Sequence, residues 1–308
     1  MDPEADATGA ARRRSLSPIL QNEEFQPLSS TVRVDYGACS DIRPKGAPNE
    51  DHYLIVRLGR SQETLATSLL DAETPQQFRE FGYGFVVADG LGGTGSGGVA
   101  SRVAISTLVH LMVHYGRWNV RVDARTAFEI LERLDWVYGE LDEVVKRHAR
   151  TNARLAEMST RLTGAYSAGD ELFVFHSGKS GAYIFRNGFL SPLSDVPPPP
   201  QPVVKLGPRL VGDDRDRLED MLSDALGGEG RARVVTARYK LEDGDVLVLC
   251  SERMVDALGE ERIADILTDR RDSNESSRRL VDAALEGRSA ENATVILAQY
   301  RIPSRRPR

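Results

Sequence analysis

Carboxylate side chains stand beside strand-like segments in four separate places along the chain. Each of these acids precedes or follows an apolar run, and they are Glu50, Asp51, Asp89, Glu252 and Glu291. An acidic side chain at the end of an apolar strand is costly to desolvate unless it is paired or bound to a cation. Carboxylate oxygens are the ligands that the hard cations Mg²⁺ and Mn²⁺ prefer. If the fold gathers these acids, the pattern predicts a divalent-metal site; taken singly, each acid is a turn former.

A glycine-rich segment, DGLGGTGSGG at 89–98, lies between an apolar run and a helix-like segment. Two interpretations stay open. The backbone N–H groups of such a loop can cradle a phosphate at a helix N-terminus, or the glycines can form a tight turn that lets the helix pack closely. The segment has no Walker lysine and no dinucleotide-type glycine spacing. Spacing alone therefore does not favour nucleotide binding.

The elements that must position these residues show strand-like and helix-like periodicity in succession. Strands are predicted at 32–36, 52–58, 83–88, 162–167, 171–175, 182–186, 233–239, 246–250 and 293–300. Helices are predicted at 98–114, 124–149, 260–268 and 276–285. The polar stretch 197–231 is predicted to be a mobile flap or loop. Because this order is not a regular βαβ alternation, two mainly antiparallel sheets with helices outside fit better than a parallel sheet.

Composition limits the classes of function. Lys and Arg total 40 against 46 for Asp and Glu, a net charge of −6 over 308 residues, so no global basic field favours nucleic acid or a membrane surface. Only two cysteines, Cys39 and Cys250, are present, which argues against a disulfide framework and predicts a cytoplasmic location. We expect a disordered segment at 1–30, one domain at 31–301 and a basic tail at 302–308.

Motifs in chain order resemble the protein phosphatase 2C family of metal-dependent (PPM-type) serine/threonine protein phosphatases, particularly its bacterial branch. They are Ser40-Asp41, Asn49-Glu50-Asp51, VVADGLGGTGSGGVAS at 86–101, MSTRLT at 158–163, HSGKSGAYIFRNG at 176–188, DGDVLVLCSERMVD at 243–256 and Glu291-Asn292-Ala293-Thr294. The resemblance covers residues 33–300. It implies an α+β fold, a four-layer α-β-β-α sandwich, which agrees with the predicted element order.

The family's chemistry uses two Mg²⁺ or Mn²⁺ ions that activate water for attack on phospho-Ser or phospho-Thr. By resemblance, Asp89 is the bridging carboxylate and the Gly90 carbonyl is a ligand. Glu50 is implied to orient metal-bound water, and Asp51 to form a hydrogen bond near the nucleophile. Two further metal ligands correspond to positions where the family has Asp, here Glu252 and Glu291.

The sequence departs from the family at four places. The family's GDSR reads Gly178-Lys179-Ser180-Gly181, its SDG reads Ser251-Glu252-Arg253, its closing Asp-Asn reads Glu291-Asn292, and its phosphate-binding Arg aligns with Gly46, near Arg43 and Lys45. Lys179 exchanges a negative for a positive charge. It either holds phosphate directly, as a catalytic residue beside Glu50 and Asp51, or points into solvent from a hairpin.

The sequence leaves two functions open, one of an enzyme and one of a binding module. The intact acids favour a phosphatase of reduced activity that acts on phosphorylated proteins. The changed charges at Lys179, Gly181, Arg253 and Gly46 favour a pseudophosphatase that binds a phosphoprotein or a regulator. Cys250 and His176 lie on apolar strands, where each is interpreted as a packed residue rather than as a catalyst.

Overall fold

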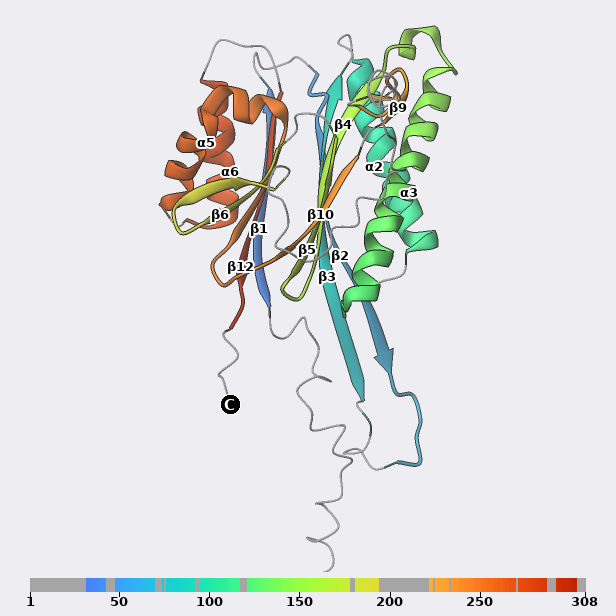
Figure 1. Cartoon of the computed structure of the whole chain (residues 1–308), viewed down its shortest axis with the longest axis vertical. Helices are drawn as coiled ribbons and strands as arrows, with labels where there is room; N and C mark the ends of the chain where they lie inside the picture. Colours follow the sequence, from blue (N-terminus) through green and yellow to red (C-terminus); the bar gives the residue numbers. More distant parts are fainter. Residues whose placement is uncertain are drawn as a thin grey trace, which may run out of the picture.

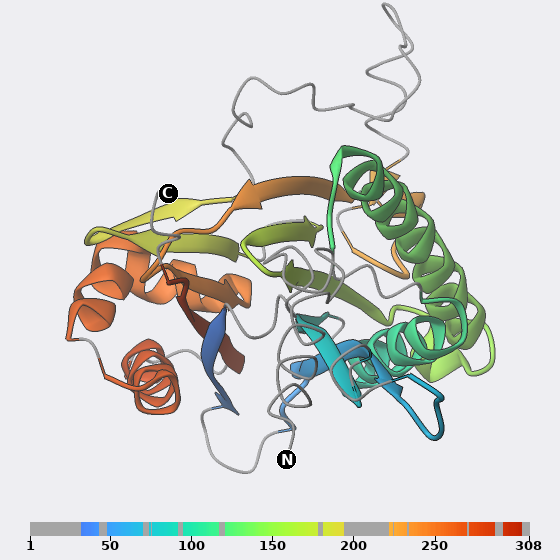
Figure 2. The ribbon, with the colours of Figure 1, turned by 90° about the horizontal axis from the view of Figure 1, so that it is seen from below.

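Two five-stranded antiparallel sheets face each other in the computed structural model, and helices cover both outer faces (Figures 1 and 2). The structure describes residues 32–42, 48–69, 74, 76–91, 95–116, 121–177, 181–193, 222–223, 225–232, 234–269, 271–286 and 292–303. Across these residues the four layers are α5 and α6, the first sheet, the second sheet, and α2 with α3. The predicted α-β-β-α sandwich is therefore confirmed.

Each sheet combines strands from distant parts of the chain. The first sheet runs β1 (Arg33–Ile42), β12 (Asn292–Arg301), β11 (Val246–Cys250), β6 (Gly181–Arg186) and β7 (Phe189–Pro192). The second runs β10 (Val235–Lys240), β5 (Glu171–His176), β4 (Ser159–Ala168), β3 (Gln77–Leu91) and β2 (His52–Glu63). The helices are α2 (Ser96–Tyr115), α3 (Ala124–Ala149), α5 (Glu252–Thr268), α6 (Ser273–Leu285) and the short η4 (Ala153–Leu155). A small parallel pair joins β8 (Leu222–Ser223) to β9 (Arg231–Ala232).

Strand β3 is buried on both faces, which explains its continuous apolar run. Successive side chains of a strand point to opposite faces of its sheet. Phe85 and Val87 face the other sheet and pack in the layer between the sheets. Val86 and Ala88 point the other way and pack against α2 and α3. The sequence run is therefore apolar at every position, as in strands covered on both sides.

Helix α2 covers the outer face of the second sheet. Its length and apolar composition would also suit a membrane span, but here Ala100, Ala104 and Leu108 are buried in the same cluster as Val86 and Ala88. One face of α2 is therefore packed against the sheet, while Val113 and Tyr115 near its end are exposed.

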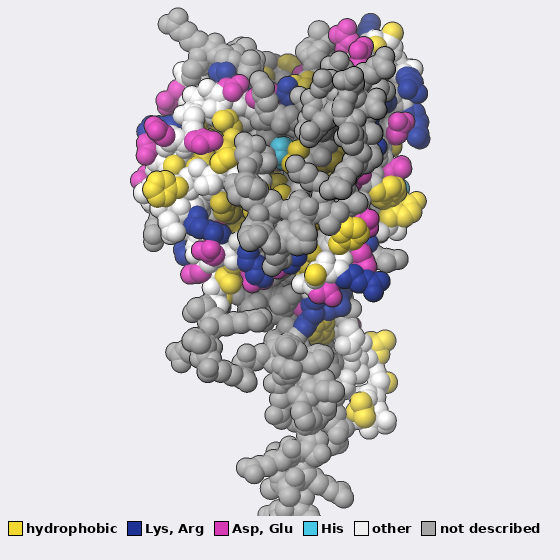
Figure 3. Space-filling model, in the orientation of Figure 1, with side chains coloured by type: hydrophobic (Ala, Val, Ile, Leu, Met, Phe, Trp, Pro, Cys, Tyr) yellow, Lys and Arg dark blue, Asp and Glu magenta, His cyan; other side chains and the backbone are white. Residues whose placement is uncertain are grey.

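The described surface carries charges of both signs. On the face shown in Figure 3, Lys and Arg side chains lie among Asp and Glu side chains, with apolar side chains scattered between them. This mixture is the surface expected from a sequence with 40 basic and 46 acidic residues. Interactions between exposed charges are weakened by water and salt. Electrostatic specificity is therefore better sought in buried groups than on this face.

Several predicted boundaries differ from the structure. Asp89 and Gly90, expected to follow their strand, lie inside β3 and pair with Arg161 and Thr160 of β4. The helix predicted at 260–268 corresponds to the part of α5 that follows Gly259, which adopts a positive φ of 68° and interrupts the helix. The first part of α5, from Glu252, was not predicted.

The prediction of a loop throughout 197–231 is wrong at its far end. Residues 194–221 lie outside the described residues. Beyond them, Leu226 is fully buried and forms an isolated β-bridge with Thr160. The buried Asp142 of α3 accepts hydrogen bonds from the N–H groups of Gly227 and Ala232. This segment therefore packs on β4 and α3, and its backbone groups find partners that a solvated loop does not need.

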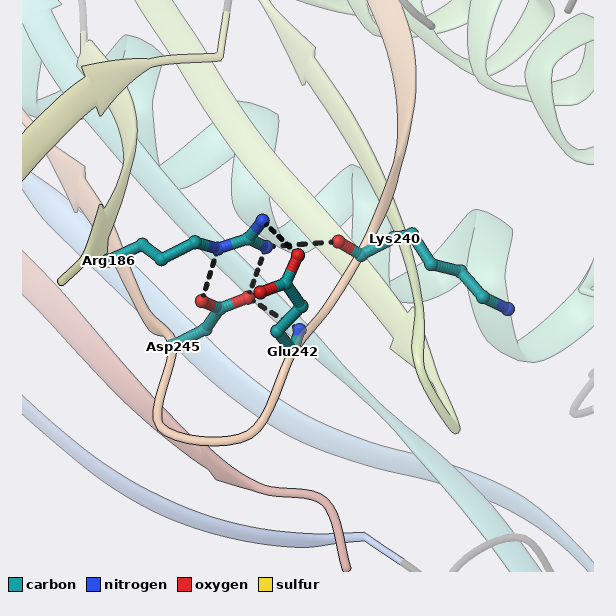
Figure 4. Close-up of polar contacts among 4 residues, drawn as sticks. All are labelled: Arg186, Lys240, Glu242 and Asp245. Atoms are coloured by element: carbon teal, nitrogen blue, oxygen red, sulfur yellow. Dashed lines mark hydrogen bonds and ion pairs between the residues drawn. The ribbon is translucent and has the colours of Figure 1, made fainter. Parts of the chain in front are cut away.

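An ion-pair cluster fixes the turn by which the chain passes from the second sheet to the first. Arg186 of β6 binds both carboxylate oxygens of the buried Asp245, each at 2.7 Å (Figure 4). The same guanidinium donates to Glu242 and to the Lys240 carbonyl. Because bidentate arginine–carboxylate pairs are geometrically specific, this cluster sets where β11 begins.

Helix α6 approaches β1 so closely that only glycine fits between them. A Cβ atom on Gly37 would lie 2.3 Å from the carbonyl carbon of Ser273. Asp35 holds that end of the helix, since its carboxylate accepts from the Ser273 N–H at 2.9 Å and its carbonyl accepts from the Ser273 hydroxyl at 3.1 Å.

Gly37→Ala is expected to lower the free energy of unfolding by about 1–3 kcal/mol, because the added methyl group pushes α6 away from the sheet. Gly139→Ala is the matched control. Gly139 lies inside α3 with open space around its Cβ position, so the same change should raise stability by about 0.5–1 kcal/mol. Urea denaturation of both variants measures this, and equal shifts would contradict the packing argument.

Candidate metal and phosphate site

The candidate site lies where the layer between the sheets changes from apolar to polar. On β3 the inward positions Phe85 and Val87 are followed by Asp89, and on β12 the inward position Ile296 is preceded by Thr294. Both changes occur at the same end of the sandwich, since Thr294 and Asp89 both contact Asp51. The site is therefore built on strands whose apolar portions are fixed in the core.

Asp51 is held by a closed ring of hydrogen bonds. Its Oδ2 accepts from the Thr294 hydroxyl at 2.7 Å, and its N–H donates to the Asn49 side chain at 3.0 Å. The Ser40 hydroxyl completes the ring, 2.6 Å from Thr294 Oγ1 and 2.8 Å from Asn49 Nδ2. Asn292 adds a long contact of 3.5 Å to Asp51 Oδ1. With 4% of its surface exposed, Asp51 is fixed in position by side chains of the first sheet and by Asn49.

The carboxyl groups of Asp51 and Asp89 contact each other in a buried environment. Burial, the negative charge of Asp89 and the hydrogen bond between the two groups raise the pKa of Asp51 to about 8. Burial also raises the pKa of Asp89, but the Arg161 guanidinium, the Glu252 N–H and the hydrogen bond from Asp51 oppose that rise. Two like charges this close cannot both ionise without a counter-ion. The raised pKa therefore favours the protonated form of Asp51 at neutral pH.

Asp89 also contacts residues of β4 and the start of α5. Its Oδ2 accepts from the Glu252 N–H at 3.4 Å, and its carbonyl accepts from the Thr160 hydroxyl at 2.9 Å. Arg161 lies directly opposite Asp89 in the β3–β4 register. The Arg161 guanidinium forms an ion pair with the Glu252 carboxylate.

The glycine-rich segment brings Glu50 against the start of α2. A Cβ atom on Gly97 would lie 2.6 Å from the Gly90 carbonyl carbon and 2.7 Å from Glu50 Oε2. The Ser101 hydroxyl donates to the Glu50 carbonyl at 2.6 Å. These contacts show the close packing that the glycines were predicted to permit. Residues 92–94, which a phosphate cradle would also use, lie outside the described residues.

The structure brings five of the predicted site residues together, and they are Glu50, Asp51, Asp89, Gly90 and Glu252. Lys179 and Glu291 lie outside the described residues, as do Arg43, Lys45 and Gly46. Among the residues that the structure does describe, no three His, Cys, Asp or Glu side chains converge as a metal-binding group. Glu252 faces Arg161 in this arrangement.

Sequence reasoning missed Arg161 and Thr294. The strand containing Arg161 was predicted to begin at residue 162, one position too late to include it. The alternation of side chains along β4 could have revealed Arg161. Ala165 faces the other sheet, and residues 163 and 161, two and four positions earlier, lie on the same face of the strand. Thr294 follows the same rule on β12, two residues before the inward-facing Ile296.

The two residues interpreted as packed rather than catalytic are both buried. Cys250 has no exposed surface, and burial raises the pKa of its thiol to about 12. It is therefore not a thiolate at neutral pH. His176 is 7% exposed, at the end of β5 between Thr163 and Val235.

The described residues fit a hard divalent cation at the Asp51–Asp89 contact. Both carboxylates are buried, and a cation between them would remove the repulsion that a proton now relieves. Asn292 Oδ1 is buried beside them without a hydrogen-bond partner. These are the all-oxygen donors that Mg²⁺ and Mn²⁺ require. The Glu252 carboxylate fits less well, because a guanidinium already neutralises it.

Comparison with known proteins supports the assignment of the fold and adds a family relationship. No family model matches the chain. The chain is 28% identical over 221 residues to serine/threonine phosphatase Stp of Listeria welshimeri, covering 70% of this chain and 84% of the relative. It is 28% identical over 214 residues to serine/threonine protein phosphatase PstP of Mycobacterium tuberculosis, covering 69% of this chain and 39% of the relative.

Among solved structures, the PstP catalytic domain in complex with two manganese ions matches with a TM-score of 0.61 at 25% identity, covering 88% of this chain and all of that domain. The serine/threonine phosphatase of S. agalactiae matches with a TM-score of 0.62 at 19% identity, covering 86% of this chain and 99% of that one, a likeness of fold alone. The architecture is therefore the protein phosphatase 2C-like fold. In sequence, the chain is similar to the bacterial serine/threonine phosphatases Stp and PstP.

Asp51→Asn is expected to stabilise the metal-free protein at pH 8. The unfolded-state pKa of Asp51 lies near 3.9 and the folded value is raised to about 8, so between these values the folded protein binds more protons. Stability is then lost as pH rises, by at most about 1.4 kcal/mol per pH unit. The substituted amide removes this loss and can still accept from Thr294.

The test is urea denaturation in chelator at pH 4.5 and pH 8, with the exposed Asp265→Asn as control. The advantage of the Asp51→Asn variant should be large at pH 8 and small at pH 4.5. An advantage that does not change with pH would show that Asp51 is not protonated by its contact with Asp89.

Proposed function

We propose that this protein is a metal-dependent phosphatase that hydrolyses phospho-Ser or phospho-Thr on proteins. The observation that carries the proposal is the buried Asp51–Asp89 carboxyl pair at the polar end of the two-sheet core. Keeping two acids in contact costs stability unless a cation joins them, and a cation that binds there can do chemistry. The substrate class is supported by the serine/threonine phosphatase names of the relatives.

Each described residue has a proposed role. Asp89 and the Gly90 carbonyl hold a Mg²⁺ or Mn²⁺ ion, and Glu50 orients the water beside it. Asp51, fixed by Thr294, accepts the proton of the attacking water. The bound ion supplies a water of lowered pKa and polarises the phosphoryl oxygens. Two ions, with Glu252 and Glu291 as further ligands, follow from the resemblance.

A second candidate function is a pseudophosphatase that binds a phosphoprotein or a regulator without turnover. One observation favours it. Within the acidic cluster formed by Asp51, Asp89 and Glu252, Arg161 forms an ion pair with Glu252 and neutralises its charge. The two functions differ in whether phosphate is released, while both predict recognition of a phosphorylated protein.

Hydrolysis of a phosphothreonine peptide, measured as phosphate release with Mn²⁺, with Mg²⁺ and with EDTA, separates the two. We expect metal-dependent turnover that falls at least about a hundredfold in Asp89→Asn, because metal assistance supplies several kcal/mol of transition-state stabilisation. Asp265→Asn makes the same chemical change at an exposed position of α5 and should keep wild-type activity. Wild-type turnover no higher than that of Asp89→Asn would exclude the enzyme. Retained peptide binding would then support the pseudophosphatase.

The affinity for Mn²⁺ is expected to rise with pH by up to about tenfold per unit, because binding must displace the proton held by Asp51. The rise should begin above the ordinary carboxyl range and level off near the raised pKa of Asp51, about 8. Isothermal titration calorimetry in buffers of different ionisation enthalpy measures both the affinity and the proton released. Asp51→Asn should release none. If the affinity for Mn²⁺ does not change between pH 5 and pH 8, the cation binds elsewhere.

A further inference from the structure

Arg161 brings a permanent positive charge into the acidic cluster. Its strand register places it opposite Asp89, on the inward face of the second sheet. Its NH1 group forms an ion pair with Glu252 Oε2, and 21% of each of these two side chains is exposed. Its charge is also the largest influence that lowers the pKa of Asp89. One guanidinium therefore serves two acids, Asp89 on β3 and Glu252 at the start of α5.

The position of Arg161 matches that of a counter-ion and not that of a surface ion pair. Its Nε is buried and has no hydrogen-bond partner, so this part of the side chain is removed from water. Glu252 begins α5, and its N–H donates to Asp89 Oδ2. Arg161, Glu252 and Asp89 therefore form one contact group. A guanidinium stays charged at every physiological pH, so this group contains one permanent positive charge without a metal ion.

The acidic cluster therefore has two halves with different electrostatic balance. In the half made by Asp51 and Asp89, two acidic groups meet in a buried environment, and Asp51 has hydroxyl and amide partners there. In the half made by Asp89 and Glu252, Arg161 supplies the compensating charge. A divalent ion is attracted to the first half. At the second half it would meet a fixed cation and a carboxylate that is already paired.

We propose that Arg161 takes the place of one of the two divalent ions, so that the protein binds a single ion at Asp89, on the side that faces Asp51. This inference rests on the proposed metal-dependent site and specifies how that site is filled. It differs from the PstP structure, which contains two manganese ions. In this protein one cation would be an exchangeable metal ion, and the second positive charge would be the guanidinium of Arg161.

Counting bound Mn²⁺ in the full-length protein tests the inference without any assay of activity. Equilibrium dialysis against Mn²⁺, followed by elemental analysis, is compared for wild type and Arg161→Met, which keeps much of the side-chain volume and removes the charge. We expect wild type to bind one ion fewer than Arg161→Met. Arg161→Gln is a second neutral variant in case Met does not fold. Arg161→Lys keeps the charge and should bind the wild-type number.

Two further measurements locate the extra ion. If it lies beside Glu252, the double variant Arg161→Met with Glu252→Gln should return to the wild-type number. Two Mn²⁺ ions in such a site lie about 3.5–4 Å apart, so their spin coupling should weaken the six-line electron paramagnetic resonance signal of bound Mn²⁺ in Arg161→Met alone.

Equal numbers of bound ions in wild type and in a folded neutral variant would overturn the inference. It is also overturned if the numbers are equal and only the KM for the phosphopeptide rises, since Arg161 would then contact phosphate. The proposed function fails independently. Wild type that binds one ion fewer than Arg161→Met but releases no phosphate refutes the enzyme and keeps the inference, whereas an active wild type with two bound ions does the reverse.

Discussion

The contact between the buried carboxyl groups of Asp51 and Asp89 is the constraint on which the site depends. Such a pair is unfavourable by itself, so the surrounding structure must hold both groups in place. It does so with the closed ring of Thr294, Ser40 and Asn49 around Asp51. The first sheet gives the ring its rigidity, because β1 and β12, which carry Ser40 and Thr294, are paired along their whole length. The two acidic groups are thereby kept in contact, which is the basis of the proposed cation site.

The sandwich converges on this end because the same alternation that builds the core also aims the polar residues. Along β3 and β12, inward positions are apolar until the strands reach the edge, where Asp89 and Thr294 take the same orientation. Glycines at 90 and 97 then let the start of α2 bring Glu50 against this edge. Function and packing therefore depend on one geometric rule, the two-residue period of a strand. A shift of register by one residue would remove the acids from the site along with the core residues from the core.

Much of this arrangement could be predicted from the sequence. The fold follows from the order of the elements and from motifs spread over the chain, and the acids could be singled out because they stand beside apolar runs. What sequence patterns could not give was pairing across strands. Arg161 was placed outside its strand by one residue, and nothing local shows that it faces Asp89 or reaches Glu252. The start of α5 was hidden by Gly259, whose positive φ breaks the periodicity that identifies a helix. These are long-range facts, fixed by register and by the meeting of two sheets.

Arg161 also gives the carboxyl pair its asymmetry. Asp51 and Asp89 are both buried, so desolvation alone would leave the position of the shared proton undecided. Arg161 lies opposite Asp89, and its charge lowers the pKa of that group. Asp51 has hydroxyl and amide donors around it but no cation among the groups that shift its pKa. Arg161 therefore favours the charged form of Asp89 over that of Asp51. In the proposed function, this asymmetry would suit Asp89 for binding a metal ion and Asp51 for exchanging a proton.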